Sequence, residues 1–326
     1  MPESSGNLSA PTIRLTTQSM ACEFAVILNR DAKKYADGGS LALERVHTLA
    51  ECMTAYEPES ELVRLNEAAQ PTRISSDLEG VLQQALDLFN QTDGWFDPTT
   101  GPLIELWRYC RGEQRVPTDQ EIQTTLQQVG GQHVSLADGT VTLANGVKLN
   151  LGAIGKGFAL DQAAQIMRSE DAVDWMLHGG RSSILASGSH NNQDGWPVGI
   201  GNPIFTNQRL GVLVIKDQAL GTSGSNIQYF RHAGKRYGHI LNPKTGWPAS
   251  QVASVTILAP TAAEADALST AFFVGGVEFA RSYCDNRPQV SAILIPFPET
   301  GKRIEPVLVN MPADRVSWSP EQVNLA

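Results

Sequence analysis

The chain has 326 residues, of which 41% are apolar and 18% charged, and its formal net charge is -9. This apolar content is enough for a sizeable core and excludes a chain that is disordered throughout. Nucleic acid is not expected as a partner, because phosphate backbones are bound by clustered Lys and Arg and this chain is acidic. A nucleotide remains compatible with this charge where backbone amides and a metal neutralise its phosphates.

The cysteines and the N-terminus predict a cytoplasmic protein. The four cysteines lie far apart without a CxxC pair, so reduced thiols are expected rather than a disulfide framework (Cys22, Cys52, Cys110 and Cys284). The N-terminus lacks the basic and apolar regions of a signal peptide. No segment has the roughly 20 consecutive apolar residues that cross a bilayer, so no membrane span is expected.

The N-terminal part of the sequence predicts an arm followed by two strands. Residues 1–11 are polar and rich in Pro and Ser, which is typical of a flexible arm. The remainder, residues 12–326, has no repeat, low-complexity tract or linker. We therefore expect a single catalytic domain, with two intimately joined subdomains as the alternative. Alternating apolar residues predict strands at Ile13–Leu15 and Cys22–Leu28.

Helices are predicted where apolar residues recur at intervals of three and four. This pattern covers Ser40–Thr54 and Ser76–Thr92. The first residue of the second helix is expected to be its N-cap, with Glu79 completing a capping box. A further helix is expected to open at the glycine-rich turn Gly152–Gly157 and to end near Met167.

Elsewhere the sequence favours antiparallel strands. Asn145-Gly146 lies between the apolar runs Val141–Leu143 and Val147–Leu151, which is a strong hairpin signal. The glycine-rich stretch 175–215 and the run Ala253–Leu258 predict further strands. Because helices and strands alternate without a regular βαβ rhythm, we expect an α+β fold with mainly antiparallel sheets flanked by helices.

A predicted C-terminal helix presents two hard oxygen ligands. Thr261 and Glu264 match a capping box that places the start of this helix. Asp266 and Thr270 are four residues apart, so their side chains share one helix face. A carboxylate and a hydroxyl suit Mg2+, with Mn2+ as an acceptable substitute. Taken alone, the segment favours a structural acid near the helix N-terminus and a threonine bonded to the preceding turn.

Two glycine-rich segments are candidates for binding phosphate. Asn150–Gly157 leads from a strand into a helix N-terminus, which favours an anion, but its spacing matches neither a Rossmann motif nor a P-loop. Gly221–Ser225 is expected to form a nest of backbone donors. His239, just before an Asn-Pro turn, is a candidate general base, although a lone histidine is more often structural. No GxSxG elbow supports a serine hydrolase.

Aromatic residues beside turns are candidates for stacking on a flat ring. Tyr56 precedes a Glu-Pro pair, and Trp95 and Phe96 precede Asp97 and a proline. The same residues fit ordinary core aromatics next to tight turns.

None of these segments decides the function alone, but their order and combination do. In chain order they are TAYEPESELVRLN, FDPTTGPLIELW, LNLGAIGKGFALD, GTSGS, GKRYGHILNPKTGWP and SVTILAPTAAEADALSTA. Together they resemble the FAD:protein FMN transferases of the ApbE family, from about Thr17 to about Val290. The resemblance implies a compact α+β architecture, related to the T-fold, with FAD bound in a cleft.

The resemblance also implies an enzymatic activity and its residues. Family members cleave FAD, attach FMN through a phosphoester bond to a Thr or Ser of an acceptor protein, and release AMP. By motif position, Asp266, Thr270 and the backbone carbonyl of Ala153 fall on Mg2+-binding positions. His239 falls on the position of the base that deprotonates the acceptor hydroxyl. The family positions that contact FAD are occupied by Met20, Tyr56, Trp95, Phe96, Asp97, Asn150, Lys156 and Leu241.

The chain departs from the family pattern at three places. Asn150 stands where Asp is usual, and Ser19–Cys22 varies a TMGT-like start. Arg181, within His178–Ser183, brings positive charge where an AGGD-like pattern is common. Hydrolysis of FAD to FMN and AMP, and flavin binding without chemistry, therefore stay open as alternatives. No DxxSGAT-like acceptor motif is present, so the expected partners are FAD and a separate acceptor protein; a homodimer is left open.

Overall fold

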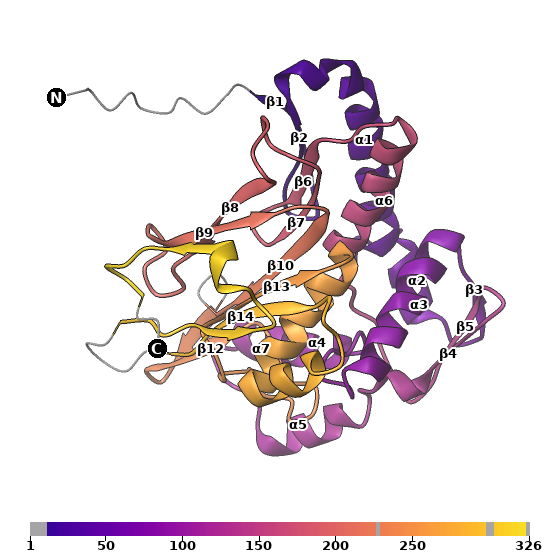
Figure 1. Cartoon of the computed structure of the whole chain (residues 1–326). Helices are drawn as coiled ribbons and strands as arrows, with labels where there is room; N and C mark the ends of the chain where they lie inside the picture. The colour runs from indigo at the N-terminus through magenta and orange to yellow at the C-terminus, as the bar shows by residue number, and fades with distance from the viewer. Residues whose placement is uncertain (1–11, 226–228, 298–302, 324–326) are drawn as a thin grey trace.

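The computed structural model describes residues 12–225, 229–297 and 303–323, and the predicted arm at residues 1–11 lies outside them. Helices cover one face of a large sheet, and smaller sheets lie beside it (Figure 1). Neighbouring strands within these sheets are antiparallel. This confirms the predicted α+β class.

The main sheet has eight strands in the order β1-β2-β6-β7-β10-β13-β14-β15. Its strands are β1 (Thr12–Ser19), β2 (Cys22–Asn29), β6 (Trp175–Gly179), β7 (Ser183–Ser187), β10 (Gln218–Gly224), β13 (Ser254–Ala259), β14 (Ser291–Ile295) and β15 (Val307–Val309). The predicted first strand pair is thus the β1–β2 hairpin. Its two turn residues, Met20 and Ala21, have positive φ angles of 47° and 57°, which a two-residue hairpin turn of this hand requires.

Three helices pack on one face of this sheet: α1 (Ala36–Met53), α6 (Gly155–Ser169) and α7 (Ala262–Cys284). Apolar residues of the helices and of the covered strands form the main core, where Leu268 and Ile257 are fully buried. Burial of such side chains stabilises the fold by about 2 kcal/mol each. The helix predicted from apolar spacing at residues 40–54 corresponds to α1, and the helix expected to open at the glycine-rich turn 152–157 corresponds to α6.

A small sheet covers part of the opposite face. It consists of β8 (Trp196–Gly201), β9 (Arg209–Ile215) and β16 (Val316–Trp318). A second core lies between the two sheets, with Trp196 from β8 and Ile293 from β14 almost fully buried in it. The strand-like, glycine-rich stretch 175–215 is therefore shared between two sheets.

Most of the remaining elements lie at the end of the molecule that carries α4 (Figure 1), whereas the 3-10 helix before α1 and the one before β16 lie next to those two elements. The remaining elements are α2 (Glu61–Glu67), α3 (Ser76–Gln91), α4 (Gly101–Gly112), α5 (Asp119–Leu126), the sheet of β3 (Thr72–Arg73), β4 (Val134–Ala137) and β5 (Thr140–Leu143), the hairpin β11 (Tyr229–His232) and β12 (Lys235–Gly238), and the 3-10 helices η1 (Arg30–Tyr35), η2 (Gly131–His133) and η3 (Ala313–Arg315). A third core joins α4, α5 and the β11–β12 hairpin around Trp107 and Tyr237.

The hairpin predicted at Asn145-Gly146 is wrong. The hairpin instead joins β4 to β5, and its turn lies before β5, at Asp138-Gly139. Asn145 and Gly146 do form a turn with positive φ angles, but the chain then leaves the sheet, and Lys148 forms an isolated parallel bridge with Thr100.

Two predicted capping boxes are also corrected. Ser75 rather than Ser76 caps α3, by accepting from the Leu78 amide. Glu79 accepts from the Gly139 amide and so fastens the β4–β5 turn to α3 instead of closing a box. At α7, the Thr261 hydroxyl caps the helix by accepting from the Glu264 amide, whereas the Glu264 carboxylate does not accept from the Thr261 amide in return.

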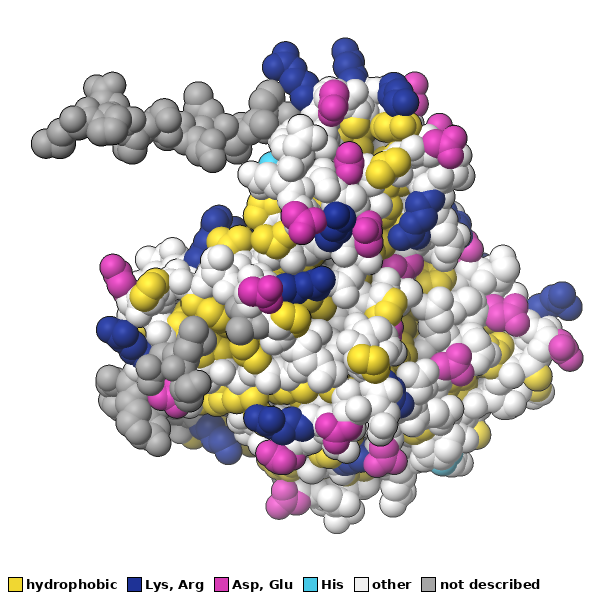
Figure 2. Space-filling model, in the orientation of Figure 1, with side chains coloured by type: hydrophobic (Ala, Val, Ile, Leu, Met, Phe, Trp, Pro, Cys, Tyr) yellow, Lys and Arg dark blue, Asp and Glu magenta, His cyan; other side chains and the backbone are white. Residues whose placement is uncertain are grey.

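All four cysteines are free thiols, as predicted. Among the described residues, we find no helix with the length and apolar character needed to cross a membrane. On the face shown in Figure 2, Lys and Arg side chains are interspersed with Asp and Glu and form no continuous basic surface.

Two glycines set how closely α7 approaches its neighbours. A Cβ atom at Gly157 would lie 2.0 Å from the Ala262 carbonyl oxygen. A Cβ atom at Gly221 in β10 would lie 2.3 Å from the Ala265 carbonyl oxygen. Both distances are far inside van der Waals contact, so α7 can occupy its position only because these side chains are absent.

Gly221→Ala is therefore expected to lower the free energy of unfolding by about 3 kcal/mol, because the clash is between backbone atoms that cannot rotate away. Gly80→Ala in α3 is the matched control, since its Cβ would lie 3.5 Å from the Phe158 ring and should stabilise the helix by about 0.5–1 kcal/mol. Urea unfolding of both variants checks this expectation. Equal effects of the two substitutions would contradict the close approach.

Candidate active site

One cavity of about 510 Å³ lies beside the first turns of α7. Every site residue assigned from the motifs borders it: Met20, Tyr56, Trp95, Phe96, Asp97, Asn150, Ala153, Lys156, His239, Leu241, Asp266 and Thr270. A second hollow of about 470 Å³ shares Met20, Tyr56, Asn150 and Lys156 with it, so the two form one cleft. The fold thus brings together residues as far apart in the sequence as Met20 and Thr270, which are 250 positions apart.

The helices α6 and α7 cap each other at this cavity. Asp161 of α6 accepts from the amides of Ala262 and Ala263 at 2.8 and 2.9 Å, at the start of α7. Asp266 of α7 accepts from the Gly157 amide at 2.8 Å, in the first turn of α6. The first amides of a helix have no acceptor within the helix, and each carboxylate supplies one for the other helix. Its negative charge also interacts favourably with the positive end of that helix's dipole.

Asp266 is a buried carboxylate without an ion-pair partner among the described residues. Its other oxygen accepts from the Ser183 hydroxyl at 2.7 Å. Burial raises the pKa of Asp266, while the positive charge of Lys156 and the hydrogen bonds from Ser183 and Gly157 oppose this. A buried acid compensated in this incomplete way is costly, and a bound cation would offset the cost.

Several hydroxyl groups lie near this carboxylate, and the sequence pattern did not predict them. Ser183 is fully buried and is the first residue of β7, two positions after Arg181. Ser223 of β10 contacts the hydroxyls of Ser269 and Thr270 at 2.8 and 3.4 Å. The alternation of β10 was the available signal, because every second residue of a strand faces the same side.

The segment Gly221–Ser225 does not form the predicted nest. Residues up to Gly224 belong to β10, where Gly221 pairs with β7 and Gly221–Gly224 pair with β13. This pairing uses backbone groups of the segment, so they do not form a nest. The Ser223 hydroxyl contacts Ser269 and Thr270 beside the cavity, whereas the Thr222 hydroxyl contacts Thr256 of β13.

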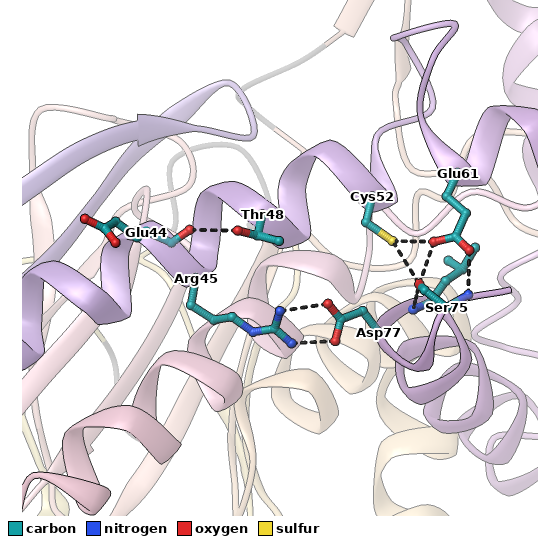
Figure 3. A network of polar contacts seen from close by, with 8 residues as sticks. Glu44, Arg45, Thr48, Cys52, Glu61, Ser75 and Asp77 are labelled. Carbon is teal, nitrogen blue, oxygen red and sulfur yellow. Dashed lines mark hydrogen bonds and ion pairs between the residues drawn. The ribbon is translucent and has the colours of Figure 1, made fainter.

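Tyr56 lies in the turn between α1 and α2, and a polar network connects these two helices (Figure 3). Glu61 accepts from the Ser75 amide and hydroxyl at 2.6 and 2.5 Å and from the Cys52 thiol at 3.2 Å. Burial, with the Glu61 contact second, raises the pKa of Cys52 to about 12, so this thiol is unreactive at neutral pH. The network joins α1, α2 and α3 and leaves Tyr56 projecting, with 70% of its surface exposed.

The other predicted contact residues differ in how much of their side chains face the cavity. Phe96 and Leu241 are 2% and 8% exposed and lie mainly in the core. Trp95 is half-buried, with the Lys244 ammonium 4.2 Å from its ring centroid. Asp97 accepts from the Thr99 amide and hydroxyl at 2.8 and 2.5 Å, and burial raises its pKa. Trp95 is therefore better placed to stack on a bound ring than Phe96.

Polar groups line the remaining wall. Asn150 accepts from the Gly152 amide at 3.0 Å through its side-chain oxygen, a contact that an aspartate could also make. The exposed side chains of Arg181 and His239 come from the loop before β7 and the segment after β12. The cations bordering the cavity are thus Lys156 and Arg181.

The residues present fit a divalent cation. Asp266 offers a carboxylate, Thr270 a hydroxyl and Ala153 a backbone carbonyl, all bordering the same cavity. These are hard oxygen donors suited to Mg2+ or Mn2+. Only one of them is an acidic side chain, which agrees with the absence of any cluster of three His, Cys, Asp or Glu side chains among the described residues.

The capping carboxylate of Asp161 makes stability depend on pH. Burial raises its pKa from 3.8 to about 6, against the lowering effect of the Ala262 and Ala263 amides. A raised pKa gives stability that is complete below the unfolded value and is lost as pH rises through the folded value. Between pH 4 and pH 7, the free energy of unfolding of the metal-free protein should fall by on the order of 3 kcal/mol relative to that of the Asp161→Asn variant. Urea unfolding in EDTA measures this, and a pH-independent difference would contradict it.

Comparisons with known proteins identify the family of this chain. The model of the ApbE family matches residues 20–294. The FAD:protein FMN transferase of Haemophilus influenzae is 33% identical over 76% of this chain and 78% of its own. The crystal structure of the ApbE protein of Thermotoga maritima superposes with a TM-score of 0.80 at 29% identity, covering 87% of this chain and 94% of its own. The flavin transferase ApbE of Vibrio cholerae superposes with a TM-score of 0.77 at 26% identity, covering 92% and 97%. With its fold, the order of its motifs and the matched span all in agreement, this chain belongs to the ApbE family.

Proposed function

We propose that this protein cleaves FAD, transfers the FMN group to a Thr or Ser hydroxyl of an acceptor protein, and releases AMP. Curated relatives carry the name FAD:protein FMN transferase. The observation that carries the proposal is one cavity in which Asp266, a buried carboxylate without an ion-pair partner in the part of the chain that the structure describes, lies with Lys156 and the exposed His239.

The cleft has the parts needed to hold FAD. Tyr56 and Trp95 present ring faces for stacking on the flat isoalloxazine or adenine groups. Lys156, in the first turn of α6, adds a positive charge to a helix N-terminus that favours phosphate. Asn150 adds a neutral hydrogen-bonding group to the same cleft.

Asp266, Thr270 and the Ala153 carbonyl would hold Mg2+, or Mn2+ in its place. The bound ion would supply positive charge next to the pyrophosphate oxygens. The Asp266 carboxylate is held by hydrogen bonds from the Gly157 amide and the Ser183 hydroxyl. Because these contacts are buried, the carboxylate keeps one orientation and needs little reorganisation when the substrate binds.

His239 is assigned as the base. In the transfer, the acceptor hydroxyl oxygen bonds to the FMN phosphorus, the bond from that phosphorus to the bridging oxygen breaks, and AMP leaves with this oxygen. The hydroxyl proton passes to the imidazole of His239. In-line placement of the hydroxyl, phosphorus and leaving oxygen supplies much of the rate.

Hydrolysis of FAD to FMN and AMP is the second candidate. His239 is exposed to solvent at the cavity, so water can reach the position of the acceptor hydroxyl. The balance between the two reactions therefore depends on whether an acceptor occupies that position.

The proposal is tested with FAD, Mg2+ and a peptide that carries a DxxSGAT-type acceptor motif. We expect AMP and a peptide whose mass has increased by the FMN group. AMP with free FMN would indicate hydrolysis, and intact bound FAD without AMP would indicate a flavin-binding protein; either result contradicts transfer.

His239→Gln should reduce FMN transfer by about 10²–10⁴-fold, the range lost with a general base. The dissociation constant of FAD should change by less than about twofold, because the base acts on the acceptor hydroxyl. His47→Gln is the matched control, since His47 is also exposed but contacts Thr17 and does not border the cleft. Unchanged transfer in His239→Gln would remove the assignment.

A further inference from the structure

The β11–β12 hairpin has an outer face formed by Tyr229, Arg231 and Arg236. These side chains are exposed, and they share one face because Arg231 and Arg236 are direct cross-strand partners and Tyr229 lies two residues before Arg231. The Arg236 guanidinium is 3.9 Å and that of Arg231 5.9 Å from the centroid of the Tyr229 ring. Gly238 is the cross-strand partner of Tyr229 and adds no side chain to this face.

The inner face of the hairpin holds it in place. Phe230 and Tyr237 are cross-strand partners whose rings stack at 5.2 Å, and both pack against Trp107 of α4. The Trp107 indole donates to the Gly246 carbonyl at 2.8 Å. Arg236 also donates to the Ser225 carbonyl. The two guanidinium groups are therefore presented by a packed element.

The pairing of Arg231 with Arg236 costs stability. Like charges directly opposite in an antiparallel pair repel each other, typically by a few tenths of a kcal/mol to about 1 kcal/mol. Neither arginine forms an ion pair with any residue that the structure describes. Residues 229–238 contain no acid at all in a chain whose net charge is -9. Folding does not explain this concentration of positive charge, whereas a negatively charged partner would.

The hairpin is attached directly to the candidate base. The strand β12 ends at Gly238, and His239 is the next residue. The cavity behind it adds the cations Lys156 and Arg181, while its acids, Asp97 and Asp266, are only 9% and 6% exposed. Because His239 directly follows β12, a segment that brings a hydroxyl to His239 would lie next to the hairpin.

We propose that the outer face of the β11–β12 hairpin binds an acidic segment of the acceptor protein and thereby places the acceptor hydroxyl at His239. This rests on the proposed transfer reaction and adds the chemistry of its partner. Guanidinium groups bind carboxylates through paired hydrogen bonds in a fixed plane. The contact would lie beside the reacting atoms and outside the FAD cleft, so it should govern acceptor binding without affecting FAD.

The test uses three synthetic peptides of equal length, each with one central Thr flanked by Asp, by Asn or by Lys residues. Binding of each peptide to the FAD-loaded protein is measured by fluorescence anisotropy, and FMN transfer and AMP release by mass spectrometry. The same measurements follow for the double variant Arg231→Glu/Arg236→Glu. The control is Lys33→Glu/Lys34→Glu, which changes the net charge equally on η1, away from the cleft.

We expect the Asp peptide to bind at least about tenfold more tightly than the Asn peptide, and this preference to weaken as salt screens the charges. The double hairpin variant should lose the preference and bind the Lys peptide better, with its FAD affinity and acceptor-independent AMP release unchanged. The η1 control should behave as the unmodified protein.

Two results would overturn the inference: equal binding of the Asp and Asn peptides, or an Asp preference that survives in the hairpin variant. Anionic lipid vesicles or a DNA oligonucleotide that bound through the same arginines in place of the Asp peptide would also overturn it. Absence of both AMP and FMN transfer would instead count against the proposed function, whatever the peptide binding shows.

A stability measurement separates this role from a structural one. Arg231→Gln removes one of the two repelling charges, so it should leave the urea midpoint unchanged or raise it while weakening binding of the Asp peptide. A lower midpoint accompanied by an equal loss of FAD affinity would show that Arg231 supports the fold, and would contradict the docking role.

Discussion

The structure depends on the mutual capping of α6 and α7 by two buried carboxylates. Asp161 closes the start of α7 and Asp266 closes the start of α6. The close approach at Gly157 makes this arrangement possible. It positions the N-terminus of α6, with its positive dipole end, and Asp266 and Thr270 of α7 at the wall of one cleft. The helix that carries Asp266 and Thr270 is thereby held in one place relative to the glycine turn that carries Ala153.

The same arrangement leaves a charge imbalance that a substrate complex would correct. The charge of Asp266 makes Asp161 harder to ionise, because it contributes to the raised pKa of Asp161. Lys156 compensates in part. A divalent cation at Asp266 would complete the compensation, and its own remaining charge would attract a pyrophosphate. The cost of burying the carboxylate in the free protein is therefore consistent with a site prepared for a metal and an anion.

Local sequence patterns predicted much of the site but not its connections. The spacing of Asp266 and Thr270 and the glycine turn before α6 are local features, and the structure places both beside the cleft. The contact between Ser183 and Asp266 joins residues 83 positions apart, and no local pattern encodes it. The Asn145-Gly146 signal failed because Asp138-Gly139 offered a competing turn and residues after Gly146 leave the sheet. Adjacent serines at 75 and 76 left the N-cap of α3 ambiguous by one residue.

The central claim is that Asp266 is a metal ligand and not only a helix cap. Crystals grown with FAD and Mn2+ test it through anomalous scattering from the ion. The account predicts a peak about 2.2 Å from oxygens of Asp266, Thr270 and Ala153, as expected for such ligands, and loss of this peak in Asp266→Asn crystals that still contain FAD. FAD bound in the cleft of the unmodified protein with no Mn2+ peak at Asp266, or with the ion held by other residues, would contradict the account.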